Sequence, residues 1–462
     1  MNIPIVIICY NNYKYVQNTL DQIRKINIEY YKNVIILNNS STCIDTINFL
    51  KNVDVKVIDT ANNGPWISST ANKHIYDILP DKYIVTDPDL ELNEKMPSNF
   101  VEILSNLSDK YGVFKIGLAL DISDFEKMYQ TGYYGDTNIY DWEKRFWNDK
   151  INDSKYELYR APIDTTFCLL NKNNNNDDGI RVAGNFTAKH LPWYIDNKVY
   201  NVYENYMANI KTLTGISTIA RLILPYFEKK YLKINKNDEL FLIENNSNNP
   251  NLYFWKHHYE NWESDSFKVY DKYLSKNNIL IEIGGWIGAT SIYGCRKSKH
   301  VYSIEADSLS FDDLNTNLQI NCTNNYTLIN KAIYNIDDIK VKFGKNKFLE
   351  NSKMNDSTSN LYNDSDKPEE YYLVDTITLE SIITNYQINP SEIGLIKVDI
   401  EGGEENILND LNDIYTKYKI PIYVSFHLTW WNDKNLDRFE WLSDTIKNQI
   451  QADPFGSILV FE

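Results

Sequence analysis

Short runs of apolar residues alternate with stretches of helical periodicity in two separate parts of the chain. The first series has runs at 3–9, 34–37, 55–58 and 83–86, and the second at 279–283, 301–304, 326–330, 394–398 and 422–426. Continuous apolar strands separated by helices are typical of parallel sheets that helices cover on both faces. The pattern therefore predicts an α/β protein with two Rossmann-like domains, and the 462 residues are enough for two or three domains.

The region between the two series has a mostly helical pattern. We expect a first domain at 1–198, a helical linker at 199–235 and a second domain at 236–462. A segment at 350–370, rich in Asn, Ser, Asp and Lys, is predicted to be a polar loop inside the second domain.

Composition and charge exclude several classes of protein. The net charge of −16 and the lack of a basic patch argue against a nucleic-acid partner. No apolar run approaches the roughly 20 residues of a membrane span, and the start of the chain lacks the basic region of a signal peptide. Five scattered cysteines, without a CxxC pair, predict neither a disulfide framework nor a structural zinc site. We expect a cytoplasmic protein, in the host cell if the gene is viral; nothing in the sequence indicates its oligomeric state.

The first series carries two carboxylates directly after an apolar strand, in Asp87-Pro88-Asp89. Carboxylates one residue apart at the end of a strand suit a hard cation such as Mg²⁺ or Mn²⁺, which can bridge two phosphates. Asp-Pro-Asp is also a good turn sequence, so the motif alone leaves a turn and a metal site open.

The order of the polar turns in this series adds to that motif. Segments 4–12, 34–41 and 62–66 each place asparagines at or near the end of a strand, and the Asp-x-Asp follows. This arrangement resembles the GT-A glycosyltransferases, especially family-2-like members. The resemblance implies a GT-A sheet, a nucleotide-sugar donor that we expect to be UDP-linked, and a carbohydrate acceptor.

By position, the resemblance places Tyr10 and Asn12 beside the nucleotide and Asn38 near the base. Asp87 and Asp89 would hold Mn²⁺ or Mg²⁺ on the diphosphate. The family usually carries Asp in the turn after the second strand, where this chain has Asn38-Asn39, so base recognition is the less secure part of the assignment.

Two further residues of the first series are candidates for chemistry. An inverting transferase needs a carboxylate to accept the acceptor's proton, and the resemblance makes Asp164 the candidate base; an isolated Asp is otherwise a helix cap or turn residue. His190 would complete the metal shell or lie packed beside Trp193, and Arg181 would offset phosphate charge.

The second series begins with a strand that runs into Glu282-Ile-Gly284-Gly285-Trp-Ile-Gly288. Glycines let the backbone approach a ligand closely, and this spacing differs from the dinucleotide fingerprint. The next strand ends at Glu305, where a carboxylate can accept both hydroxyls of a ribose, as in NAD and S-adenosylmethionine sites.

The most specific motif is Lys397-Val-Asp399-Ile-Glu401-Gly-Gly-Glu404, which together with segments 374–380, 331–332 and 425–427 resembles the FkbM-type methyltransferases. The resemblance implies a class I O-methyltransferase sheet with S-adenosyl-L-methionine as cofactor. Residue by residue, it places Glu282 at the methionine amino end, Gly284, Gly285 and Gly288 at the cofactor turn, Glu305 at the ribose, and Asp399 and Glu401 near the transferred methyl.

An alcohol needs a base or a metal ion to attack a sulfonium methyl group. Asp399 and His427 are the candidates at the sheet ends, while Glu401 and Glu404 also fit a helix N-terminus, where carboxylates are favoured.

Together the two resemblances predict a bifunctional enzyme that transfers a sugar and O-methylates a sugar hydroxyl. The alternative is a carbohydrate-binding or scaffold protein in which one Rossmann-like unit is degenerate and only methyl transfer remains. An NAD-dependent oxidoreductase is disfavoured by the glycine spacing and the Asp399 segment.

Overall fold

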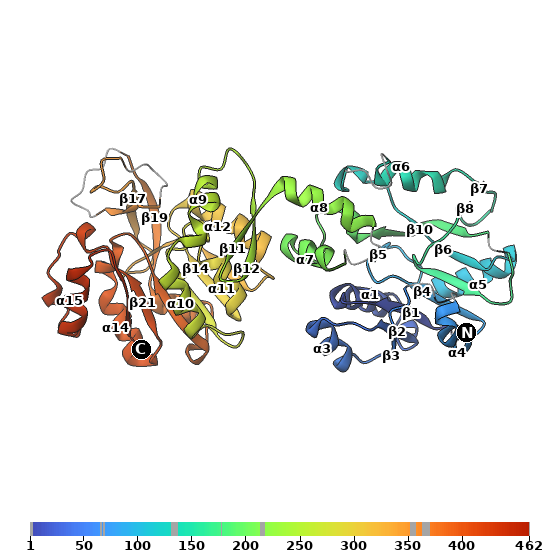
Figure 1. The fold of residues 1–462 in the computed structure, drawn as a ribbon, viewed down its shortest axis with the longest axis horizontal. Helices are drawn as coiled ribbons and strands as arrows, with labels where there is room; N and C mark the ends of the chain where they lie inside the picture. Colours follow the sequence, from blue (N-terminus) through green and yellow to red (C-terminus); the bar gives the residue numbers. More distant parts are fainter. Residues whose placement is uncertain are drawn as a thin grey trace. The chain divides into compact units, whose positions relative to one another are not determined.

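The computed structural model of the chain describes residues 3–64, 67, 70–130, 137–176, 178–212, 218–351, 357–362 and 370–461 (Figure 1). Contacts divide the chain into two compact units. The first consists of Met1–Tyr200 and Glu204–Phe227, and the second of Asn201–Tyr203 and Glu228–Glu462. The division falls inside the predicted linker, and the functional bounds at 198 and 235 stay a prediction.

The first unit follows the predicted alternation of strands and helices. Its elements in chain order are β1 (Ile5–Cys9), α1 (Tyr13–Ile26), α2 (Ile28–Tyr31), β2 (Val34–Asn39), α3 (Ile44–Asn52), β3 (Lys56–Thr60), α4 (Lys73–Ile78), β4 (Lys82–Thr86), β5 (Leu90–Leu92), α5 (Phe100–Tyr111), β6 (Lys115–Leu120), α6 (Ile139–Lys144), β7 (Lys150–Ile151), β8 (Leu158–Arg160), β9 (Cys168–Asn171), β10 (Ile180–His190), α7 (Val202–Thr212) and α8 (Thr218–Lys230).

These strands form one mixed sheet in the order β3-β2-β1-β4-β9-β6-β10-β8-β7, with β5 paired to β10. Strands β3, β2, β1 and β4 are parallel, and Cys9 lies opposite Asn38 in register. Because parallel strands end at one edge, the polar turns after β1 and β2 and the Asp-x-Asp after β4 lie along the same edge. Residues 62–64 follow the end of β3; Pro65 and Trp66 of the predicted motif lie outside the described residues.

The second unit opens with a hairpin and continues as alternating strands and helices. Its elements are β11 (Tyr231–Lys236), β12 (Glu239–Glu244), α9 (Leu252–His257), α10 (Ser264–Tyr273), β13 (Ile279–Ile283), α11 (Ser291–Lys297), β14 (His300–Ile304), α12 (Ser308–Asn321), β15 (Tyr326–Ile329), β16 (Ala332–Ile333), β17 (Lys340–Gly344), β18 (Asn360–Tyr362), β19 (Tyr372–Ile377), α13 (Leu379–Asn385), β20 (Ile393–Val398), α14 (Leu408–Tyr418), β21 (Ile422–Ser425), α15 (Asp444–Ala452) and β22 (Ser457–Phe461).

The main sheet of this unit has the strand order β15-β14-β13-β20-β21-β22, and all neighbours except β21 and β22 are parallel. The segment between β15 and α13 forms a smaller sheet with the strand order β16-β19-β17-β18. The fold class predicted from the apolar runs is therefore confirmed: both units are α/β structures with parallel strands.

Side-chain alternation along β13 divides the core of the second unit into two layers. Leu280 packs with residues of α10, α11 and α12 on one face of the sheet, whereas Ile281 and Ile283 pack with residues of α13, α14 and α15 on the other. Figure 1 shows the yellow-green and the orange-red helices on opposite sides of the strands. Burial on both faces explains why these strands are continuously apolar in sequence.

Two local expectations are wrong. Residues 231–235 belong to strand β11 and not to a helix, because Tyr231–Lys236 pair with β12 in a hairpin. The polar segment 350–370 holds strand β18 at Asn360–Tyr362, which pairs with β17; residues 352–356 and 363–369 lie outside the described part. In the described part of the chain, no helix combines the length and the apolar character that a membrane crossing requires.

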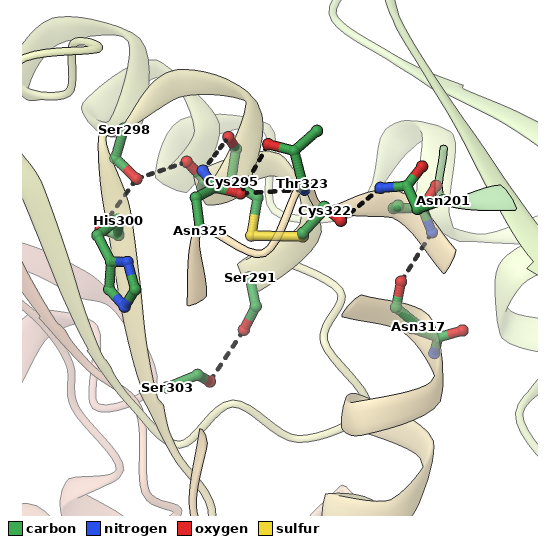
Figure 2. Close-up of a disulfide and its surroundings, with 12 residues drawn as sticks. Asn201, Ser291, Cys295, Ser298, His300, Ser303, Asn317, Cys322, Thr323 and Asn325 are labelled. Carbon is green, nitrogen blue, oxygen red and sulfur yellow. Dashed lines mark hydrogen bonds between the residues drawn. A yellow bond between two sulfur atoms is a disulfide. The ribbon is translucent and has the colours of Figure 1, made fainter. Parts of the chain in front are cut away.

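A disulfide joins Cys295 of α11 to Cys322 at the end of α12 (Figure 2), although the scattered spacing of the cysteines gave no sign of it. The two cysteines are 27 residues apart, and their Cα atoms lie 5.7 Å apart because the ends of the two helices pack together. Side-chain amides surround the bridge: Asn325 donates to the carbonyl of Cys295 at 3.0 Å, and Asn201 donates to that of Cys322. The remaining cysteines, Cys9, Cys43 and Cys168, are free.

A test of this bridge is thermal unfolding with and without reductant. A cross-link of this loop length stabilises a fold by about 2–4 kcal/mol, so reduction should lower the melting temperature of the second unit. Cys322→Ser should melt at the lower temperature and no longer respond to reductant, and Cys43→Ser, which removes a free thiol, should behave like the parent. If reductant does not change the melting temperature of the parent protein, the disulfide is contradicted.

Candidate functional site

A cavity of about 590 Å³ opens at the carboxyl edge of the second unit's main sheet. Its wall comes from the turns that follow β13, β14 and β20, and from Lys331 and the strands β17 and β18. Five residues predicted to bind the cofactor or to act on the substrate line this cavity: Gly284, Gly285, Glu305, Asp399 and Glu401.

The glycine turn after β13 is shaped by close backbone approach. Gly284 has φ +86°, and a Cβ there would overlap the carbonyl oxygen of Asp399. A Cβ on Gly285 would overlap the hydroxyl of Ser303. The amides of both glycines donate to the carbonyl of Ile304, at 2.9 and 3.0 Å, so the turn lies flat against the end of β14. Gly288, also at φ +86°, borders Leu314 and Leu318 and does not line the cavity.

Glu305 presents a buried carboxylate to the cavity from the end of β14. Backbone amides hold each of its oxygens: Trp286 donates to Oε2 at 2.7 Å and Asp307 donates to Oε1 at 2.8 Å. Burial raises the pKa of Glu305 to about 7 despite these hydrogen bonds. The carboxyl group therefore changes charge close to neutral pH.

Glu282, in contrast, does not face the cavity. Its side chain is fully buried and accepts hydrogen bonds from the hydroxyls of Tyr270, at 2.7 Å, and of Thr290 and Ser291. These contacts tie β13 to α10 and to the start of α11. The expectation that Glu282 faces the methionine amino end of a cofactor is therefore corrected: three hydroxyls behind the wall occupy its carboxylate.

Lys397 and Asp399 form a buried ion pair at the end of β20. Lys397 Nζ donates to Asp399 Oδ2 at 2.9 Å. Burial alone would raise the pKa of Asp399. The charges of Lys397 and His427, with the hydrogen bonds from Lys397 and Ser425, together outweigh burial and hold that pKa below its usual value. The same pairing, together with Glu263 and Glu282, raises the pKa of Lys397 against the effect of burial. Asp399 is therefore an ionised carboxylate with one oxygen held by a lysine.

His427 follows β21 and meets three carboxylates. Its Nδ1 donates to Glu404 Oε1 at 3.0 Å, and its Nε2 lies 3.2 Å from Glu401 Oε2 and 3.8 Å from Asp399 Oδ1. Burial would lower the pKa of His427, but the negative charges of Glu404, Glu401 and Asp399 outweigh this and raise it to about 10. At neutral pH the ring is therefore an imidazolium with a proton on each nitrogen, and it cannot accept another. These surroundings do not support His427 as the base.

Glu404 is held in place by several hydrogen bonds. It is fully buried and accepts hydrogen bonds from the amides of Gly402, at 3.1 Å, and Ile400, at 3.2 Å, and from Trp431 Nε1 at 3.0 Å. Backbone donors at the start of a short helix fit the helix N-terminus interpretation of Glu404. The contact with His427, which the sequence analysis missed, gives this carboxylate a second function, because it sets the orientation of the imidazole.

Glu401 completes the cluster from a left-handed backbone position, with φ +54°. Burial raises the pKa of Glu401 well above its usual value. Its Oε2 is buried and accepts no hydrogen bond of good geometry, although His427 Nε2 lies 3.2 Å away. In the described part of the chain, the group of His, Cys, Asp and Glu side chains whose ligand atoms converge closely enough for a metal ion is Asp399, Glu401 and His427, with all three atoms within 4.8 Å of one another.

The first unit brings Asp89 and His190 together at its sheet edge. His190 Nε2 lies 3.4 Å from Asp89 Oδ2, and its ring packs beside that of Trp193, at 4.8 Å between centroids. Burial lowers the pKa of His190, but Asp89 and Asp87 more than compensate and raise it. Asp89 Oδ1 and His190 Nδ1 are buried without hydrogen-bond partners.

Asp87 lies beside this pair but does not converge with it into a three-ligand group. Thr165 donates its hydroxyl to Asp87 Oδ2. Burial and the neighbouring Asp89 raise the pKa of Asp87 to about 7. In this structure the predicted ligands Asp87, Asp89 and His190 are therefore neighbours with unused oxygen and nitrogen atoms and not a closed metal cage.

The turns after β1 and β2 are linked by asparagines. Asn11, at φ +54°, accepts from the amides of Thr42 and Cys43 at 2.7 and 2.8 Å. Asn38 donates to Asp59 Oδ1 at 2.7 Å and accepts from the amide of Ser41 at 3.1 Å. Asn38 thus borders a carboxylate at the end of β3 that the sequence analysis missed.

The remaining candidates of the first unit have different surroundings. Tyr10 is half-buried, and Asn12, the residue before α1, accepts from the amide of Tyr10 at 3.1 Å. Asp164 is exposed, one residue before Thr165, the partner of Asp87. Arg181 is buried in an ion pair with Glu143 and donates to the carbonyl of Pro162 at 3.0 Å. The expectation that Arg181 offsets phosphate charge is therefore wrong, because its guanidinium already has partners inside the core.

Comparison with solved structures returns both transferase classes at low similarity. GalNAc-T7 with UDP, GalNAc and Mn²⁺ is 12% identical, with 52% of this chain and 66% of that chain covered and a TM-score of 0.27. Glucosyl-3-phosphoglycerate synthase from Mycobacterium tuberculosis is 17% identical over 27% of this chain and 46% of that chain, with a TM-score of 0.20. An rRNA methylase from Streptococcus thermophilus is 11% identical over 38% and 76% of the two chains, with a TM-score of 0.23. At this level of similarity, none of these structures indicates what this chain binds.

No curated protein sequence matches the chain. A family model does match: residues 282–448 fit the model described as the methyltransferase FkbM domain. The matched region begins at Glu282 at the end of β13 and includes the glycine turn, Glu305 and the Asp399–Glu401–His427 cluster. Residues 282–448 of the second unit thus match the FkbM methyltransferase domain.

Proposed function

We propose that the second unit transfers a methyl group from S-adenosylmethionine to a hydroxyl of a carbohydrate. The observation that carries the proposal is the meeting of three features at one cavity: the glycine turn after β13, the carboxylate of Glu305 and the cluster after β20. The family match supports methyl transfer. The choice of a sugar hydroxyl as acceptor is supported by the resemblance of the first unit to the GT-A glycosyltransferases.

The residues present fit this cofactor. A volume of about 590 Å³ lies within the range of small-molecule and cofactor sites. Glycine at 284 and 285 lets the turn pack directly against Asp399 and Ser303, where a Cβ would collide with their oxygen atoms. Glu305 offers a charged acceptor for ribose hydroxyls. When bound, the cofactor supplies an electrophilic methyl group on a sulfonium sulfur.

The residues of the chain then serve the acceptor. Asp399 and Glu401 line the cavity where the acceptor hydroxyl would lie, and both present carboxylate oxygens there. We place the stabilisation of the hydroxyl's departing proton on these two carboxylates, because His427 is already protonated at neutral pH. Glu404 holds His427 in place and Lys397 holds Asp399 in place. Lys397 also lines the cavity, whereas Glu404 does not.

The pKa of Glu305 predicts how cofactor binding depends on pH. Because this pKa lies at about 7, the side chain of Glu305 is mostly an ionised carboxylate above pH 7 and mostly a neutral carboxylic acid below it. Affinity for S-adenosylmethionine should therefore fall by about tenfold between pH 8 and pH 6, measured by calorimetry. Glu305→Gln should bind more weakly at pH 8 and show a flatter profile over the same range, and an identical pH profile in parent and variant would contradict the ribose contact.

Replacing Asp399 by asparagine should separate binding from turnover. Asp399→Asn keeps the shape of the side chain but removes its charge, so the affinity for S-adenosylmethionine should change no more than a few-fold. Turnover at saturating cofactor should drop by about 10²-fold or more, the usual scale for a lost group that assists proton removal. Loss of cofactor affinity with unchanged turnover would make Asp399 a binding residue.

We propose that the first unit transfers a sugar from a nucleotide-sugar donor, with Asp87, Asp89 and His190 holding a divalent cation on the diphosphate. The proposal is supported by the order of the polar turns along one sheet edge, by the unpartnered atoms of Asp89 and His190, and by Asp164 near Asp87. The nucleotide would lie over Tyr10, Asn12 and Asn38.

A matched pair of aspartate variants tests this site. Asp89→Asn should abolish Mn²⁺-dependent sugar transfer or hydrolysis of a UDP-sugar, whereas Asp81→Asn, an exposed position before β4, should not affect it. Methyl transfer should survive in both variants, because the methyltransferase residues lie in the other unit. A parent protein that neither binds nor hydrolyses nucleotide sugars would instead favour the alternative, a degenerate first unit beside an active methyltransferase.

A further inference from the structure

We propose that Asp399, Glu401 and His427 bind one divalent cation in the wall of the second unit's cavity. This site is separate from the cation proposed for the first unit. The site itself stands on the geometry of these side chains, and its part in activating an acceptor hydroxyl rests on the methyl transfer proposed above.

The three ligands come from the ends of neighbouring parallel strands. Asp399 and Glu401 follow β20, and His427 follows β21, which pairs with β20. His427 Nε2 lies 3.2 Å from Glu401 Oε2 and 3.8 Å from Asp399 Oδ1. Atoms at these separations surround a point to which all three can coordinate after small side-chain shifts.

The imidazole is aimed at this point by its other nitrogen. Nδ1–H of His427 donates to Glu404, and Glu404 is itself held by Trp431 Nε1 and by two backbone amides. A metal-bound histidine in proteins almost always donates its second N–H to such a buried acceptor, which fixes the ring and its tautomer. The chain therefore already contains the outer partner that a metal-binding histidine requires.

An unused ligand atom is the second observation. Glu401 Oε2 is buried and accepts no hydrogen bond of good geometry, and its residue adopts a left-handed backbone conformation that turns the carboxylate into the cluster. Lys397 occupies Oδ2 of Asp399 and leaves Oδ1 facing His427. The Ser425 side chain also hydrogen-bonds to Asp399. Glu401 Oε2 is therefore the oxygen of this cluster that remains open for coordination.

Charge balance in the cluster also favours a cation. Asp399, Glu401 and Glu404 together place three carboxylates around His427, and Lys397 pairs with Asp399. A divalent cation would replace the Nε2 proton at the point where negative charge converges. Two carboxylate oxygens and one imidazole nitrogen match Mn²⁺ or Mg²⁺ chemistry better than that of softer ions.

The position of the site indicates what the ion would do. Asp399 and Glu401 line the cavity, so open coordination positions would face the bound acceptor. A hydroxyl on the cation would be more acidic than a free one. The carboxylates of Asp399 and Glu401 would stabilise the departing proton, which would pass to water as the hydroxyl oxygen attacks the methyl carbon. The carbon–sulfur bond would break with its electron pair left on sulfur. The acceptor class is therefore an alcohol whose oxygen can reach a metal ion, such as a sugar hydroxyl.

The test is a Mn²⁺ titration of the full chain, followed by the electron paramagnetic resonance signal of free Mn²⁺. The background variant Asp87→Asn/Asp89→Asn removes the first unit's candidate ligands. We expect this variant to bind one Mn²⁺, and Glu401→Gln or His427→Gln added to it should weaken that binding at least tenfold. Asp433→Asn, which removes an exposed carboxylate of the same unit, should leave it unchanged.

Circular dichroism and calorimetry with S-adenosylmethionine, carried out on the same proteins, show whether each variant is folded and binds the cofactor. A folded background variant that binds no Mn²⁺, or one whose binding survives both Glu401→Gln and His427→Gln, would overturn the metal site. Mn²⁺ binding without any S-adenosylmethionine binding would confirm the ion and contradict the proposed methyl transfer.

Discussion

Strands β13 and β20 approach so closely at their carboxyl ends that no side chain fits at position 284. The amide of Asp399 donates to the carbonyl of Ile283 at 2.9 Å, and the carbonyl of Asp399 lies where a Cβ of residue 284 would be. This contact places the glycine turn and Asp399 side by side. The proposed cofactor end and the proposed acceptor end of the cavity are thus set by one pair of strands.

Buried partners fix the orientation of the side chains in the acidic cluster after β20. Lys397 holds one oxygen of Asp399, and Glu404 holds one nitrogen of His427. Each partner is nearly or fully buried, so removing it would leave an unpaired charge away from water, which is costly. Lys397 and Glu404 are therefore positioning residues, and the cavity-facing carboxylates owe their orientation to them.

Much of this could be predicted from the sequence, because strands buried on both faces form unbroken apolar runs. Strand β13 has the predicted bounds, and the glycine turn and Glu305 line the predicted edge. The spacing of Lys397 and Asp399 could also have been used, because residues two apart in a strand point to the same face. That reasoning would have predicted their ion pair.

Other features depend on packing between distant segments and leave no local signal. The disulfide requires the ends of α11 and α12 to meet, and the cysteines are 27 residues apart. The hydrogen bonds of Glu282 come from α10 and from the start of α11, so its position behind the wall could not be inferred from the motif that contains it. Arg181 likewise forms an ion pair with Glu143, which lies 38 residues earlier in the chain.

The central claim is that the cavity at the edge of β13, β14 and β20 binds S-adenosylmethionine. The most direct measurement is a calorimetric titration of S-adenosylmethionine into the full chain at pH 8, where the carboxylate of Glu305 is ionised. We predict saturable binding with one cofactor per chain. A folded protein that shows no binding at millimolar cofactor would contradict the account.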